Sequence, residues 1–304
     1  MAKIFCIANQ KGGVGKTTTT VNLAAGLAKV GQRVLMIDLD PQGNATMGSG
    51  IDKRQLELTV YDVLLESASV AEARVKADKL VEGGCGYDVL GANRELAGAE
   101  VEMVALDRRE KRLRTALAAV GAEYDFVLID CPPSLSLLTL NGLCAAHGVI
   151  VPMQCEYFAL EGLTDLVNTI KQVHANLNKN LQIIGLLRVM FDPRITLQQQ
   201  VSEQLKAHFG DKVFDTVIPR NVRLAEAPSY GLPGVVFDPA ARGSQAFIAF
   251  AKELVEKLPP ASAFASNAVA PPIAPVDPGA PSLAIPEDVL APAAASDSTS
   301  EKSL

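Results

Sequence analysis

The sequence predicts an α/β fold in which a twisted, mostly parallel sheet is covered by helices on both faces. Short apolar runs alternate with longer segments whose apolar residues recur at helical spacing, the pattern of strands buried between helices. At Pro259 the composition changes to Ala, Pro and Ser with isolated acidic residues. We therefore expect one folded domain over residues 1–258 and a disordered tail over residues 259–304.

The expected elements follow one another in a regular order. The strands are runs of consecutive apolar residues and the helices are amphipathic segments between them. The expected strands are residues 4–8, 33–38, 87–90, 124–130, 148–153, 181–189 and 213–218, and the expected helices are residues 21–28, 96–120, 160–175, 197–209 and 244–258.

A glycine-rich segment joins the first strand to the first helix. It reads Lys11-Gly12-Gly13-Val14-Gly15-Lys16-Thr17, the P-loop of a nucleoside triphosphatase in a form with a second lysine, Lys11. Backbone N–H groups at the start of the helix attract an anion, and glycine lets phosphate approach the backbone closely. We expect a single P-loop NTPase domain whose phosphate-binding residues are Lys11, Gly12, Gly13, Val14, Gly15, Lys16, Thr17 and Thr18.

Two acidic residues at strand ends complete the expected nucleotide site. Asp130 ends an apolar strand, where a carboxylate beside a P-loop holds Mg²⁺, and the Thr17 hydroxyl is the second expected metal ligand. Asp40 follows the strand that ends at Asp38, and we expect it to orient the attacking water. Lys16 would contact the β- and γ-phosphates. Lys11, Lys16 and Asp40 are thus the catalytic candidates.

Several classes of protein are disfavoured by composition. No run approaches the ~20 apolar residues of a membrane span, and the first strand starts too early for a signal peptide. The five cysteines are scattered without a C-x-x-C motif, which favours reduced thiols in the cytosol and opposes an iron–sulfur site. Four of the six excess negative charges lie in residues 259–304, so residues 1–258 carry a net charge of only −2.

Five segments together resemble the ParA-type partition ATPases, the chromosomal kind also called Soj. This group belongs to the deviant-Walker family, with MinD and the nitrogenase iron protein. The resemblance covers residues 3 to about 257, and its last two segments separate ParA-like chains from their relatives better than the P-loop does. The segments are residues 11–20, 38–44, 127–134, 154–162 and 218–229.

The resemblance implies a cycle of ATP binding and hydrolysis. Its cofactors are ATP and Mg²⁺, and its partners are a second copy of the chain, nonspecific double-stranded DNA and a ParB-type centromere-binding protein that accelerates hydrolysis. In the ATP-dependent homodimer, Lys11 would reach the partner's phosphates, and the dimer would act in DNA segregation on the nucleoid in the cytoplasm. Pro219 and Asn221 match positions that contact the adenine.

DNA contacts are expected from arginines near the carboxyl ends of the last two strands. Arg194 and Arg220 match family positions implicated in nonspecific DNA binding, and Arg223 lies close to Arg220 in the chain. The alternative interpretation is that these arginines pair with Asp192, Asp211 or Glu226. A second basic segment, residues 108–114, is expected to form a solvated face within the helix of residues 96–120.

Two other function classes stay open. One is a MinD-like, membrane-associated positioning ATPase, although residues 259–304 lack the basic amphipathic helix that such a protein uses for membrane docking. The other is a metal-cluster carrier of the iron-protein type, which the cysteine pattern opposes. Operator-specific repression is not expected either, because no helix-turn-helix precedes the first strand.

Overall fold

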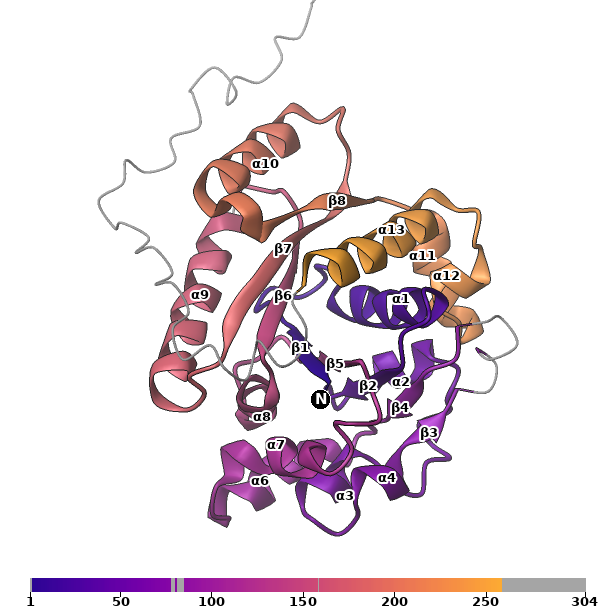
Figure 1. Cartoon of the computed structure of the whole chain (residues 1–304), viewed down its shortest axis with the longest axis vertical. Helices are drawn as coiled ribbons and strands as arrows, with labels where there is room; N and C mark the ends of the chain where they lie inside the picture. The colour runs from indigo at the N-terminus through magenta and orange to yellow at the C-terminus, as the bar shows by residue number, and fades with distance from the viewer. Residues whose placement is uncertain (1, 78–79, 81–84, 158, 259–304) are drawn as a thin grey trace, which may run out of the picture. The chain divides into compact units, whose positions relative to one another are not determined.

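The computed structural model describes residues 2–77, 80, 85–157 and 159–258. The predicted tail, residues 259–304, lies outside the described residues. Within them the chain forms an α/β domain with a central sheet (Figure 1). The predicted fold class is confirmed for this part of the chain.

Among the described residues the sheet has eight strands, in the order β3-β4-β2-β5-β1-β6-β7-β8. Every neighbouring pair is parallel except β3 with β4, which is antiparallel. The strands are β1 Lys3–Ile7, β2 Val34–Asp38, β3 Val75–Lys76, β4 Asp88–Leu90, β5 Phe126–Asp130, β6 Gly148–Met153, β7 Gln182–Phe191 and β8 Val213–Pro219. The seven predicted strands are confirmed within about two residues, and β3 was not predicted.

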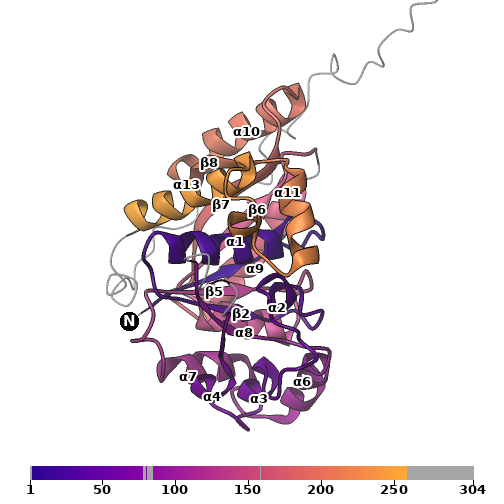
Figure 2. The same cartoon turned by 90° about the vertical axis from the view of Figure 1, so that its right-hand side faces the viewer.

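Helices cover both faces of the sheet. The α-helices are α1 Lys16–Lys29, α2 Asn44–Gly48, α3 Val60–Leu64, α4 Val70–Ala73, α6 Leu96–Glu102, α7 Arg112–Ala118, α8 Leu137–Ala145, α9 Ala159–Asn176, α10 Thr196–Phe209, α11 Val222–Glu226, α12 Gly234–Phe237 and α13 Arg242–Lys257. Helices α1 and α13 lie side by side on one face, whereas α7, α8 and α9 lie on the other (Figures 1 and 2).

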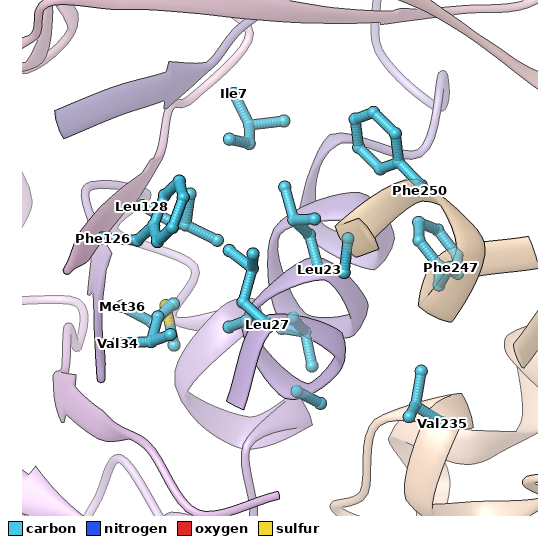
Figure 3. Close-up of a cluster of buried hydrophobic side chains, with 14 of the residues drawn as sticks. Ile7, Leu23, Leu27, Val34, Met36, Phe126, Leu128, Val235, Phe247 and Phe250 are labelled. Carbon is cyan, nitrogen blue, oxygen red and sulfur yellow. The ribbon is translucent and has the colours of Figure 1, made fainter. Parts of the chain in front are cut away.

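The apolar core on the α1 face fixes the helix that follows the phosphate loop. Figure 3 shows Leu23 and Leu27 of α1 between the strand residues Phe126 and Leu128 and the α13 residue Phe250. All five side chains are almost fully buried. Because burying one such side chain contributes about 1.5–3 kcal/mol, the position of α1 against the sheet is strongly determined.

The predicted helix over residues 96–120 is wrong as a single element. It is divided into α6, two short 3-10 helices (Met103–Ala105 and Arg109–Lys111) and α7. Arg108 has φ 50°, which no continuous α-helix allows. The buried amide of Asn141, from α8, stabilises the break by donating to the Arg109 carbonyl (2.8 Å) and accepting from the Leu113 N–H (3.2 Å).

The basic segment at residues 108–114 therefore does not lie within one helix. It runs from the left-handed Arg108 through the second 3-10 helix into the first turn of α7. Arg112 is mostly buried and pairs with Glu66 at 3.2 Å, so it is not part of a solvated face.

Candidate nucleotide site

The predicted site residues converge at the carboxyl edge of the sheet. Strand β1 lies between β5 and β6, and β5 lies between β1 and β2. Ile7 pairs with Asp130, which in turn pairs with Asp38, so β1, β2 and β5 end level with one another. Ligands of open parallel sheets bind at this edge, beside the point where the strand order reverses.

The phosphate loop leads from β1 into α1 through two left-handed glycines. Gly13 has φ 74° and Gly15 has φ 77°, a region that glycine enters without steric cost. Gly15 is also the N-cap of α1, a helix of 14 residues, so the first N–H groups of the helix face the loop. Residues Lys11 to Thr17 thus have the predicted strand–loop–helix geometry, which suits the binding of an anion.

Lys16 is buried and turned back into the loop. Its Nζ donates to the Lys11 carbonyl at 3.2 Å. Burial lowers the pKa of Lys16, and the negative charges of Asp130 and Asp40 oppose this effect. The Lys16 ammonium group is therefore held within the loop, where phosphate would lie, and it feels the charges of both carboxylates.

The Asp130 carboxylate joins β5 to the first two turns of α1. Its two oxygens accept hydrogen bonds from the hydroxyls of Thr17 and Thr20, both at 2.8 Å. Burial raises the pKa of Asp130, and the neighbouring charge of Asp38 adds to that effect, whereas the two hydroxyls oppose it. The structure thus brings the two predicted metal ligands, Thr17 and Asp130, into direct contact.

Asp38 is a buried residue that holds the segment leading to Asp40. One of its oxygens accepts from both the N–H (2.9 Å) and the hydroxyl (2.8 Å) of Thr46, and the other accepts from the Asp40 N–H (3.1 Å). Burial raises the pKa of Asp38. Asp40 itself is partly exposed, and its Oδ1 accepts from the Gln42 N–H at 2.9 Å. The predicted water-orienting carboxylate is therefore fixed within a tight turn.

The second lysine of the loop, Lys11, lies at the surface, whereas Lys16 is buried. Lys11 Nζ forms an ion pair with Glu156 Oε2 at 2.7 Å, and both side chains are 46% exposed. Glu156 follows β6, so the pair lies on the outer surface of the site.

An apolar cavity of about 160 Å³ lies beside the phosphate loop. Gly15 and Thr18 line it on the loop side, and Pro219 and Asn221 line it on the side of β8. The remaining lining residues include Val189, Met190, Ile218 and Phe247. The structure therefore places the two predicted adenine-contacting residues next to the phosphate loop.

The donor set fits a magnesium nucleotide. Thr19 borders the same cavity, and its buried Oγ1 has no hydrogen-bond partner among the described residues, so this end of the site holds a polar group that the protein alone does not satisfy. No three His, Cys, Asp or Glu side chains in the described ranges converge as a metal site. Mg²⁺ needs no such cluster here, because it keeps several waters and takes phosphate oxygens as ligands.

The three arginines predicted to contact DNA are in different environments. Arg194 is bound to Asp192 through two hydrogen bonds of 2.9 and 2.7 Å. Arg223 pairs with Glu226 at 2.9 Å and with Asp238 at 3.4 Å. Arg220 is exposed at the rim of the cavity. Two of the acidic partners of the alternative interpretation, Asp192 and Glu226, are thus observed, and DNA contact stays a prediction for all three arginines.

Five residues of the site were not among the candidates. They are Thr20, Asp38, Gln154, Glu156 and Met190. A signal existed for Asp38, which ends its strand as Asp130 does, and for Thr20, which lies one helical turn after Lys16. Gln154 and Glu156 lie in the segment 154–162 that carries part of the family resemblance, but only the structure shows that Gln154 contacts Gly13 and that Glu156 contacts Lys11. Met190 had no such signal.

Sequence similarity to known proteins identifies the family to which this chain belongs. The AAA domain profile matches residues 2–183. Over 254 residues the chain is 53% identical to the sporulation initiation inhibitor protein Soj of Bacillus subtilis, covering 84% of this chain and 98% of that protein. It is 51% identical over 257 residues to the chromosome partitioning protein ParA of Caulobacter vibrioides, covering 84% and 94%. The chain belongs to the Soj/ParA family of chromosome-partitioning ATPases.

Solved structures agree with this placement in the P-loop fold. Cobyrinic acid a,c-diamide synthase from Mycobacterium smegmatis, with bound ATP analog and magnesium, superposes with a TM-score of 0.72 at 38% identity. That match covers 84% of this chain and 95% of the synthase. MinD from Pyrococcus horikoshii, complexed with Mg-ADP, superposes with a TM-score of 0.66 at 26% identity, covering 84% and 97%.

Among the described residues of this Soj/ParA chain, none of the helices combines the length and the apolar character that crossing a bilayer requires.

Proposed function

We propose that this protein is a Soj/ParA-type ATPase that binds MgATP, pairs with a second copy across two nucleotides and binds duplex DNA without sequence preference. Hydrolysis, accelerated by a ParB-type partner, then releases the dimer from DNA. Repeated rounds of binding and release would segregate chromosomal or plasmid DNA. The relatives named for chromosome partitioning support this role.

The observation that carries the proposal is the contrast between the two loop lysines, of which one is buried and the other is half-exposed. Lys16 is buried and folds back onto the loop, so it serves its own nucleotide. The Lys11 ammonium lies on the surface, 2.7 Å from Glu156. A half-exposed ammonium at the rim of a phosphate site can reach the phosphates of a second subunit placed face to face. Such a charge stabilises the phosphoryl-transfer transition state as an arginine finger does.

The chemistry at each site follows from the groups around the loop. The loop N–H groups and Lys16 bind and orient the β- and γ-phosphates. Thr17 and Asp130 would hold Mg²⁺, which when bound offsets the charge of the phosphate oxygens. Asp40 orients the attacking water, and its place is fixed by the hydrogen bond from its N–H to Asp38. Pro219 and Asn221 hold the base at the far end of the cavity.

Asn221 connects base binding to the DNA-facing segment. Its Oδ1 accepts from the Arg223 N–H at 2.9 Å and caps α11, so the amide N–H₂ is the end that can donate to the base. The preceding residue, Arg220, is exposed at the cavity rim. A base seated against Asn221 would order this segment, and dimerisation would roughly double the number of arginines that face DNA.

One experiment tests the whole cycle. ATP turnover is measured alone, with nonspecific duplex DNA, and with DNA plus the N-terminal peptide of the ParB-type partner. We expect the highest rate with both additions. Lys11→Ala should retain ATP binding within about threefold but lose stimulated turnover by at least about 100-fold. Lys29→Ala, a control on the exposed last turn of α1, should behave as the unaltered protein.

Three results would contradict the proposal. The first is a chain that remains monomeric with a non-hydrolysable ATP analogue, and the second is equal affinity for DNA with ATP and with ADP. The third is ATP-dependent sedimentation with anionic liposomes but not with DNA, which would indicate the MinD-like alternative.

A further inference from the structure

The last part of β7 contains a β-bulge at Met190. Val189 pairs with Ile218 and Phe191 pairs with Pro219, so Met190 is an additional residue with no counterpart on β8. Its φ is 52°, in the left-handed region that a side-chain-bearing residue rarely enters. Glycine is the usual residue at a left-handed bulge position, and bulges near active sites direct a side chain to a particular place.

The bulge directs Met190 into the nucleotide cavity. Met190 lines this cavity together with Gly15, Pro219 and Asn221. A Cβ built on Gly15 would lie 3.7 Å from Met190 Cε, so the methionine packs directly over the phosphate loop. A long, unbranched thioether can adapt its shape to a planar ring more readily than a branched side chain can.

Gln154 forms hydrogen bonds to both Met190 and the phosphate loop. Its Nε2 donates to Met190 Sδ at 2.9 Å and to the Gly13 carbonyl at 3.3 Å. A side-chain amide has two N–H groups, so one Gln154 amide can make both contacts at once. Gln154 comes from the segment after β6, and it therefore joins the bulge of β7 to the loop after β1.

We propose that Met190 is a specificity-determining residue that contacts the nucleobase, and that Gln154 positions it by tying it to Gly13 of the phosphate loop. The pair makes the affinity for a complete nucleotide depend on the base as well as on the phosphates. This inference rests on the proposed ATP site and adds a role for two residues outside the predicted set.

The test compares the dissociation constant for MgATP with that for inorganic tripolyphosphate in the presence of Mg²⁺. Tripolyphosphate offers the phosphates without the base. In Met190→Gly we expect the dissociation constant for MgATP to rise about tenfold, the scale of one lost buried apolar contact, while that for tripolyphosphate stays within about twofold. Met190→Leu keeps an apolar side chain and should remain within about threefold of the unaltered protein for both ligands. Thermal unfolding of each variant checks that it is folded.

A double-mutant cycle tests the role of Gln154. Gln154→Ala should weaken MgATP binding about fivefold in the unaltered protein but less than twofold when Met190 is already glycine, because the amide acts through the thioether. Equal losses in both backgrounds would overturn the positioning role.

Two other outcomes would overturn the base contact. One is an equal loss of MgATP and tripolyphosphate in Met190→Gly, which would mean that the variant distorts the phosphate loop. The other is no loss of either ligand. These assays contain neither DNA nor a partner protein. Their result is therefore independent of whether the proposed DNA cycle is correct.

Discussion

Lys11 and Glu156 form an ion pair within one subunit, with Nζ and Oε2 2.7 Å apart. The same lysine is the one expected to reach the phosphates of a second subunit, so the intramolecular pair and the dimer compete for one ammonium group. An exposed ion pair contributes only about 0.2–1 kcal/mol to stability, so it can be broken at low cost when the triphosphate of a second subunit approaches.

Glu156→Gln should strengthen the ATP-dependent dimer. Without the carboxylate, Lys11 is free before the subunits meet, and we expect the dimer dissociation constant to fall about two- to fivefold. Analytical ultracentrifugation with a non-hydrolysable analogue measures it. Glu256→Gln removes the same charge from an exposed position near the end of α13 and should change nothing. A weaker dimer in Glu156→Gln would show that Glu156 contributes to the interface instead.

Thr20→Val should lower ATP turnover because Asp130 loses one of its two hydroxyl donors. The Thr20 hydroxyl lies 2.8 Å from Asp130 Oδ1 and is buried, so nothing else can replace it. We expect kcat to fall about tenfold while KM for ATP changes less than threefold, since Thr20 lies behind the phosphate-binding groups. Thr20→Ser keeps the hydroxyl and should restore most of the rate. Loss of ATP binding with an unchanged kcat would contradict this role.

Much of the sheet and the phosphate loop could be predicted because their signals are local. Strands buried on both faces are continuous apolar runs, and the loop from Lys11 to Thr17 carries its own geometry in its glycines. The break near Arg108 could not be predicted, because it depends on an amide from α8 that is distant in the chain. Tertiary contacts override helical periodicity at such a point.

The site divides in the same way. The positions of Thr17, Asp40 and Asp130 at the carboxyl edge of the sheet could be predicted because each ends or follows a recognisable strand or loop, whereas their roles stay predictions. Met190 could not be predicted, because its left-handed bulge arises where the pairing register between β7 and β8 shifts. The local apolar pattern does not reveal that register, so Met190, directly after the expected strand of residues 181–189, carries no sign of its place in the cavity.

Asp192→Asn should increase DNA affinity. Asp192 holds Arg194 through two hydrogen bonds, and this pairing lowers the pKa of Asp192 to about 2, so the carboxylate stays charged at all physiological pH values. Releasing the arginine and removing one negative charge should tighten DNA binding about three- to tenfold at low salt. The dependence of log K on log salt concentration should steepen by up to about one unit. Fluorescence anisotropy with two unrelated duplexes measures the DNA affinity and its dependence on salt.

The control for this prediction is Asp125→Asn. Asp125 also pairs with an arginine, Arg33, at 2.8 Å, but it lies just before β5, at the opposite edge of the sheet from the site. An equal gain in both variants would reflect net charge alone and would remove Arg194 from the DNA surface.

Arg220→Ala and Asn221→Ala should separate DNA binding from nucleotide binding within one segment. Arg220 is exposed, so its loss should weaken DNA binding about tenfold and leave ATP affinity within about twofold. Asn221 lines the cavity and caps α11, so its loss should weaken ATP binding about tenfold and lower the stability of the domain by about 1 kcal/mol.

ATP affinity is measured by calorimetry, and DNA affinity is measured at saturating ATP. If Arg220→Ala abolished ATP binding as completely as DNA binding, the two neighbours would act as one nucleotide-binding unit, and the coupling between base and DNA surface would need another route.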